Sequence, residues 1–126
     1  MSLRIVYVDD EPDIREIVTF ALEDEADMQV RMCASGSEAL RSIQADPPDL
    51  VLLDVMMPGM DGPSTLRQIR ALPGLSDVVA AFVTAKVQPS EVDEFKAMGA
   101  IGVIAKPFDP MLLPAQVRDL WARHHA

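Results

Sequence analysis

The feature that most constrains the fold is an alternation of short apolar segments with segments of helical periodicity. The apolar segments are residues 3–8, 28–34, 49–53, 78–83 and 101–105. Apolar runs of this length are typical of strands buried on both faces, as in parallel sheets covered by helices. Between these runs, apolar residues recur at intervals of three and four, as at Ile14, Ile17 and Ala21. The sequence therefore predicts five strand–helix units.

Proline and glycine residues mark the ends of the predicted helices. Residues 47–48 are two prolines after the second helix, and residues 73–74 are Pro-Gly after the third. Asp109 is expected to cap the fifth helix, with Pro110 at its first position and Pro114 about one turn inside, where it removes a hydrogen bond. Right-handed crossovers between parallel strands then predict a three-layer α/β sandwich.

Length and composition favour a single folded domain. The chain has 126 residues, of which 49% are hydrophobic. These values fit one domain over residues 1–126 and argue against disorder. No stretch reaches the roughly 18 apolar residues of a membrane span, and the first residues lack the separate apolar region of a secretory leader. Cys33 is the single cysteine, so no internal disulfide is possible, and we expect a cytoplasmic protein with no membrane partner.

Charge argues against one class of partner. Acidic residues outnumber basic ones by 20 to 11, which gives a formal net charge of -9. Such a chain is repelled by nucleic acid phosphates, so we expect no direct nucleic-acid binding. The surplus of acids suits a basic partner or a cation, and it also serves solubility.

Polar residues follow four of the five predicted strands at the point where each apolar run stops. These residues are Asp9, Asp10, Asp54, Thr84 and Lys106. Ligands of open α/β sheets bind beyond the carboxyl ends of the strands. Each residue taken alone has a simpler interpretation, such as a helix cap, a turn or a solvated charge. Their agreement at four strand ends favours a shared site.

The chemistry of these side chains indicates phosphoryl transfer. Crowded carboxylates repel one another, and a divalent cation removes that repulsion. Oxygen ligands without His or Cys suit Mg²⁺, with Mn²⁺ as the alternative. A carboxylate can attack phosphorus and form an acyl phosphate, while a metal, a lysine and a hydroxyl neutralise the phosphoryl oxygens.

Four segments carry a resemblance to a known family. "VYVDDEPDIREI", "DLVLLDVMMPGMDG", "FVTAK" and "IAKPF" resemble, in order and spacing, the motifs of the receiver domain of two-component response regulators. The resemblance covers nearly the whole chain, as in single-domain, chemotaxis-type regulators. It implies a (βα)5 flavodoxin-like fold with a parallel five-stranded sheet of order 2-1-3-4-5. It also implies a cis peptide bond before Pro107 and a tightly turning loop between Gly59 and Gly62.

The resemblance assigns a role to each matched position. It implies that Asp54 is the phosphoacceptor, that Asp54 and Asp10 bind Mg²⁺ together with the backbone carbonyl of Met56, and that Asp9 assists through water. By the same resemblance, Thr84 and Lys106 contact the phosphoryl oxygens. The phosphoryl donor would be a histidine kinase or a histidine phosphotransfer protein. The recipient of the signal, a downstream protein, is left unidentified by the sequence, as are the stimulus and the cognate kinase.

Two features depart from the family pattern or bear on its output. Val103 occupies a position where many receivers have an aromatic residue that changes the outer face of the fifth strand. We expect output to depend less on Val103 and more on the loop after Thr84 and the fourth helix. The resemblance also makes a homodimer through the fourth helix, fifth strand and fifth helix possible.

Two other functions compete with a signalling switch. One is a Mg²⁺-dependent phosphohydrolase with an aspartyl nucleophile, which would require an acid two residues after Asp54. Met56 occupies that position and cannot transfer protons. The other is a non-phosphorylated docking module, against which the complete set of site residues argues. We therefore predict a switch that catalyses only its own phosphorylation and dephosphorylation.

Overall fold

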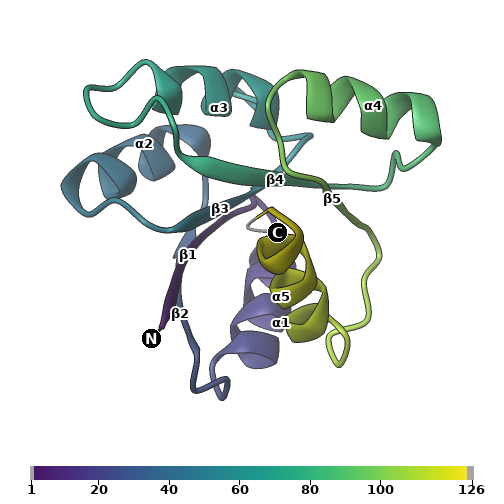
Figure 1. Cartoon of the computed structure of the whole chain (residues 1–126). Coiled ribbons are helices and arrows are strands. Elements are labelled where there is room, and N and C mark those ends of the chain that lie inside the picture. The colour runs from purple at the N-terminus through teal and green to yellow at the C-terminus, as the bar shows by residue number, and fades with distance from the viewer. Residues whose placement is uncertain (1, 125–126) are drawn as a thin grey trace.

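The five strands form one parallel sheet in the order β2-β1-β3-β4-β5 (Figure 1). The computed structural model describes residues 2–124. Its strands are β1 (Leu3–Val8), β2 (Met28–Cys33), β3 (Leu50–Asp54), β4 (Val79–Thr84) and β5 (Val103–Ala105). Its helices are α1 (Pro12–Leu22), α2 (Gly36–Ala45), α3 (Gly62–Arg70), α4 (Pro89–Ala97) and α5 (Leu113–His124). The predicted (βα)5 architecture and strand order are confirmed.

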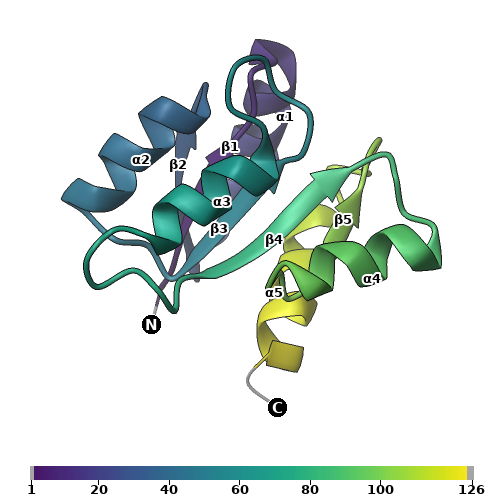
Figure 2. The same ribbon diagram turned by 90° about the horizontal axis from the view of Figure 1, so that it is seen from above.

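Helices cover both faces of the sheet. Helices α1 and α5 lie on one face, and α2, α3 and α4 lie on the other (Figures 1 and 2). Each face has its own core: Val6, Val51 and Phe82 belong to the cluster under α2, α3 and α4, whereas Tyr7 and Leu52 belong to the cluster under α1 and α5. Successive strand residues alternate between the two clusters because side chains point to opposite faces of a strand. The central strands are buried on both faces, as the apolar runs predict.

Two of the strands extend one residue further than their apolar runs. Asp54 and Thr84 are the last residues of β3 and β4, because each still belongs to the sheet ladder: Asp54 is in register with Val83, and Thr84 with Ala105. Strand β5 is shorter than predicted, since it begins at Val103. The polar side chains at 54 and 84 are therefore held by strand backbone.

The fifth helix begins later than the sequence predicts. The Asp109 carboxylate accepts a hydrogen bond from the Met111 N–H, but residues 110–112 form a turn and α5 begins at Leu113. Pro110 is therefore not its first residue. Pro114 is its second residue, where a missing N–H costs no helical hydrogen bond, so the expected disruption one turn inside the helix is wrong. Within residues 2–124, no helix has both the length and the apolar character needed to cross a bilayer.

Candidate functional site at the carboxyl edge of the sheet

Three carboxylates converge where β1 and β3 end. Oxygen atoms of Asp9, Asp10 and Asp54 all lie within 4.8 Å of one another. Asp9 is fully buried, Asp54 is 4% exposed and Asp10 is half-buried. The two strands are adjacent in the centre of the sheet, and parallel strands bring their carboxyl ends to the same edge. Asp54, which follows Asp10 by 44 positions in the sequence, thus shares one acidic cluster with Asp9 and Asp10.

The pleat of the strands aims Asp9 and Asp54 at the face covered by α1 and α5. Tyr7 and Leu52 belong to the core on that face. Asp54 follows Leu52 by two residues, and Asp9 follows Tyr7 by two, so both carboxylates continue the same face. Lys106 likewise follows Ile104 of that core by two residues. Strand periodicity therefore places Asp9, Asp54 and Lys106 on one face, and the loop after β1 brings Asp10 to them.

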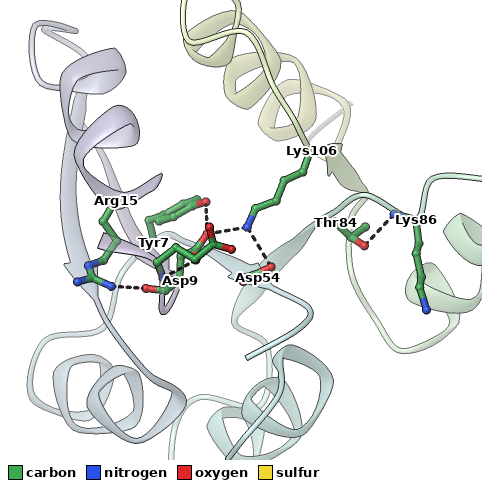
Figure 3. Close-up of polar contacts among 8 residues, drawn as sticks. Tyr7, Asp9, Arg15, Asp54, Thr84, Lys86 and Lys106 are labelled. Carbon is green, nitrogen blue, oxygen red and sulfur yellow. Dashed lines mark hydrogen bonds and ion pairs between the residues drawn. The ribbon is translucent and has the colours of Figure 1, made fainter. Parts of the chain in front are cut away.

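Lys106 connects two of the carboxylates. Its Nζ donates to Asp9 Oδ2 at 2.8 Å and lies 3.2 Å from Asp54 Oδ1 (Figure 3). The peptide bond between Lys106 and Pro107 is cis, as the family resemblance implied. The ammonium therefore offsets part of the negative charge of the cluster, and it is nearer to Asp9 than to Asp54.

Asp9 is held by several donors. Its Oδ2 also accepts the hydroxyl of Tyr7 at 3.0 Å, and its Oδ1 accepts the Glu11 N–H at 3.0 Å. Arg15, on α1, donates to the Asp9 backbone carbonyl at 2.7 Å (Figure 3). A buried carboxylate needs such donors because burial without them is costly. Both the side chain and the backbone of Asp9 are consequently fixed, and with them the start of the loop between β1 and α1.

The environment shifts the acid–base behaviour of the site. Burial is the main reason that the pKa of Asp54 rises from 3.8 to about 6; the charge of Asp9 adds to this rise, and Lys106 opposes it. Burial alone would lower the pKa of Lys106, but its bond to Asp9 and the two carboxylate charges raise it. Burial and the charge of Asp9 raise the pKa of Tyr7. The site accordingly contains a protonated lysine, a protonated phenol and a carboxylate that gains from a cation.

Thr84 lies at the same edge of the sheet, but its side chain is not among those that Lys106 joins. Val83 belongs to the core under α1 and α5, so the next residue points toward the opposite face. The Thr84 Oγ1 accepts the backbone N–H of Lys86 at 3.0 Å (Figure 3). The Lys106 backbone N–H donates to the Thr84 carbonyl. Thr84 is thus tied to the loop that leads into α4.

The loop between β3 and α3 lies directly against the end of β3. The Gly62 N–H donates to the Val55 carbonyl, and a Cβ at Gly62 would approach the Asp54 carbonyl oxygen to 2.4 Å. Gly59 has a φ of +79°, which favours glycine. The side chain of Met56 projects from this loop and is 72% exposed. The expected tight turn is present, and it leaves no room for a larger residue at 62.

The donor set fits a hard divalent cation. Three carboxylates within 4.8 Å supply only oxygen ligands, and the pKa of Asp54, raised mainly by burial and further by the charge of Asp9, marks a carboxylate whose ionised form a cation would stabilise. Sequence reasoning singled out Asp9, Asp10, Asp54, Thr84 and Lys106 but missed Tyr7 and Arg15. A signal for Tyr7 existed, because it lies two residues before Asp9 on one strand. Arg15 offered no comparable signal, since its partner is a backbone carbonyl.

Comparisons with known proteins agree on one family. A family model described as the response regulator receiver domain matches residues 5–118. Response regulator Rre1 from Synechocystis sp. is 36% identical over 98% of this chain and 54% of its own length. DNA-binding response regulator MtrA from Mycolicibacterium smegmatis is 39% identical over 94% of this chain and 50% of its own length. The chain spans about half the length of these curated relatives.

Solved structures show the same architecture. The chemotaxis response regulator CheY4 of Vibrio cholerae superimposes with a TM-score of 0.86 at 31% identity, over 95% of this chain and 99% of its own. The receiver domain of NtrX from Brucella abortus superimposes with a TM-score of 0.79 at 28% identity, over 92% of this chain and 96% of its own.

Proposed function

The chain belongs to the response regulator receiver domain family, the phosphorylation-dependent switches of two-component signalling, and we propose that Asp54 is its phosphoacceptor. One observation carries this proposal: the Asp54 carboxylate is clustered with Asp9 and Asp10 while its Oδ1 lies 3.2 Å from the Lys106 ammonium. A nucleophile at the end of a buried central strand is held rigidly, and phosphoryl transfer depends mainly on positioning.

We propose that Asp10 and Asp54 bind Mg²⁺ directly, with Mn²⁺ as a substitute, and that Asp9 contributes through water. The backbone carbonyl of Met56 would complete the protein's share of the ligands. A bound ion would neutralise charge on the phosphoryl oxygens. The support is the oxygen-only donor set within 4.8 Å.

In the proposed reaction, an oxygen of Asp54 attacks the phosphorus of a phosphohistidine. The new O–P bond forms as the N–P bond breaks, and the imidazole nitrogen leaves with the electron pair of that bond. Lys106 pairs with one phosphoryl oxygen, since its Nζ already lies beside Asp54. The chain would act only on its own phosphoryl group, because Met56 cannot serve as the acid or base of a phosphohydrolase.

We propose that Thr84 transmits the change to the surface. Its oxygen accepts the Lys86 N–H, so its own hydroxyl proton is available to a phosphoryl oxygen if the loop after β4 shifts. That loop leads directly into α4. Output would thus pass through the face formed by α4, β5 and α5, to a downstream protein or to a second copy of the chain.

A substitution at Val103 tests which part of this face carries the output. Its side chain is half-buried against the core under α2, α3 and α4, and valine has few rotamers. We expect Val103→Ala to keep both phosphorylation and binding of the downstream protein, because the switch would depend on the loop after Thr84 and on α4. Loss of partner binding with normal phosphorylation would contradict this expectation.

We propose that the phosphoryl donor is a histidine kinase or phosphotransfer protein that docks on α1 and the loop before α5. Phe20 is 70% exposed and Met111 82% exposed, and they line one shallow groove with Ile17 and Pro110. The N-terminal end of α1 adjoins the acidic cluster through the short loop after β1. A partner seated on this groove would present its histidine to Asp54.

We propose one receiver domain over residues 1–126 that works in the cytoplasm without binding DNA. DNA binding in the name of MtrA describes that longer protein, of which this chain matches half. The net charge of -9 supports the absence of nucleic-acid binding by this chain.

Intact mass spectrometry with acetyl phosphate and Mg²⁺ tests the proposed function. The wild-type chain should gain one phosphoryl group, and Asp54→Asn should gain none. Asp61→Asn is a matched control, because Asp61 is an exposed acid in the adjacent loop and asparagine preserves its cap on α3. A phosphoryl group on Asp54→Asn, or none on the wild type, would refute the assignment of Asp54.

A further inference from the structure

The hydroxyl of Tyr7 shares an acceptor atom with the ammonium of Lys106. Tyr7 is fully buried in β1, and its hydroxyl donates to Asp9 Oδ2 at 3.0 Å. Lys106 Nζ donates to the same oxygen at 2.8 Å, but lies 3.2 Å from Asp54. The same oxygen thus receives a neutral donor and a charged one (Figure 3).

The shared acceptor, Asp9 Oδ2, affects how strongly the Lys106 ammonium is bound to Asp9. A carboxylate oxygen has two lone pairs, and a donor at one of them reduces the electron density available to the other. Without the phenol, the charge at Asp9 Oδ2 would be offset mainly by Lys106, and the ammonium would be held more firmly there. Asp9 is fully buried, so bulk water does not reach it freely to replace the missing donor.

We propose that Tyr7 is a positioning residue for phosphoryl transfer. Its hydroxyl weakens the hydrogen bond between Lys106 and Asp9, and the ammonium is therefore free to move to the group on Asp54. This inference rests on the proposed function of Asp54. It requires no change of protonation at Tyr7. The phenol acts through Lys106 and does not touch the phosphoryl group.

The placement of Tyr7 suits such a role. Tyr7 is in register with Met32 of β2 and Leu52 of β3, so strands flank it on both sides. Its ring belongs to the core under α1 and α5. A ring fixed in this way holds its hydroxyl at Asp9, whereas Lys106 lies on the loop after β5 and its side chain is 17% exposed.

The test is Tyr7→Phe, which removes only the hydroxyl. At saturating Mg²⁺, phosphorylation by acetyl phosphate should slow by about three- to ten-fold, the range expected for the net contribution of one ordinary hydrogen bond. Mg²⁺ affinity, measured by titration calorimetry, should stay the same or tighten, because Asp9 then carries more uncompensated charge. A slower phosphorylation rate with unchanged or tighter Mg²⁺ affinity would identify a positioning role.

Leu52→Val is the matched control. It removes one methylene from the same layer of the core, beside Tyr7, without removing a hydrogen bond. Urea unfolding of both variants separates stability from chemistry, and Leu52→Val should phosphorylate at the wild-type rate. Equal losses of rate and Mg²⁺ affinity in Tyr7→Phe, or an unchanged rate, would overturn the inference.

The chain contains a single tyrosine, which supplies an independent readout. The tyrosine doublet in the Raman spectrum of the metal-free wild type should show a strong hydrogen-bond donor. Its ratio should change on phosphorylation, when Lys106 leaves Asp9 Oδ2. An identical doublet in both states would overturn the inference even if Asp54 is phosphorylated. Failure of the wild type to accept phosphate would instead reject the proposed function, and this inference with it.

Discussion

At the scale of single residues, the site consists of charges that are held close together before any ligand binds. Asp54 is 4% exposed, and it has the Lys106 ammonium at 3.2 Å, a longer contact than the one that Lys106 makes to Asp9. A buried carboxylate with so little compensation raises the free energy of the folded state whenever it is ionised. The same property supports the proposal that Asp54 receives a cation and a phosphoryl group.

Replacing Asp54 by asparagine should stabilise the metal-free protein near neutral pH. A pKa raised from 3.8 to about 6 means that the folded state binds the proton more tightly than the unfolded state. The free energy of unfolding therefore falls as pH rises between these values, and the loss is complete above pH 6. We expect Asp54→Asn to gain up to about 3 kcal/mol at pH 7 and nothing below pH 3.8.

Urea unfolding in the presence of a chelator measures this difference. The wild type and Asp54→Asn are compared at several pH values, so that effects of other titrating groups cancel. A stabilisation that is equally large in acid, or a destabilisation at pH 7, would contradict the raised pKa.

Replacing Lys106 by methionine should have the opposite effect. Methionine keeps the apolar stem but leaves two buried carboxylates without their cation, which we expect to cost about 3 kcal/mol in the free energy of unfolding. Only part of this loss should disappear in the Asp54→Asn background, because Asp9, the carboxylate nearer to Lys106, then remains charged and buried. A double-mutant cycle by urea unfolding measures the coupling, and additive effects would show that Lys106 does not interact with Asp54.

At the scale of elements, the molecule combines a rigid sheet with a loosely attached helix α4. Phe95 is the one buried residue among the nine residues of α4, and its ring lies 5.1 Å from that of Phe82. Arg70 on α3 adds hydrogen bonds to the carbonyls of Met98 and Gly99 at the end of α4. An element with so few attachments can shift at lower cost than the buried strands. This supports the proposal that output passes through α4.

Helix α1 is the element whose exposed face should decide the phosphoryl donor. We expect Phe20→Ala to lower phosphotransfer from the cognate kinase by about tenfold, as for a central apolar contact of an interface. Phosphorylation by acetyl phosphate should be unchanged, because Phe20 lies outside the acidic cluster. Stability should change by less than about 0.5 kcal/mol, since the side chain is mostly exposed.

Phosphotransfer profiling against the histidine kinases of the source organism identifies the donor for this measurement. Met98→Ala is the control, because Met98 is also an exposed apolar residue but lies at the end of α4. Equal losses in both variants, or a loss with acetyl phosphate, would contradict docking on α1.

At the scale of the whole molecule, metal binding should be coupled to folding. The acidic cluster exists only when β1 and β3 are paired, so the proposed Mg²⁺ site would bind the ion in the folded chain in preference to the unfolded one. Mg²⁺ at one hundred times its dissociation constant should add about 2.7 kcal/mol to the free energy of unfolding. Thermal unfolding with and without Mg²⁺ measures this gain. Asp10→Asn should lose most of it, and an equal gain in that variant would place the ion elsewhere.

The pattern of apolar and polar residues along the chain predicts the strand–helix units and the positions of the polar residues at the strand ends. The alternation of apolar runs and helical periods predicted five strand–helix units, because burial imposes those periods locally. The strand order came from the family resemblance, and the sheet confirms it. Asp54 and Thr84 were found because a polar residue after an apolar run is visible without a structure. Their functional roles stay predictions.

Which of these side chains are in contact follows from the packing of the strands and loops. This packing joined Lys106 to Asp9 across 97 positions, and it placed the Tyr7 hydroxyl on the same oxygen. It also directed the Thr84 side chain toward Lys86, away from the Lys106 contacts. Periodicity assigns a residue to a face of a strand, but distances between side chains depend on how strands and loops pack. The pKa of Asp54 follows from those distances and from burial, and therefore only the folded chain fixes it.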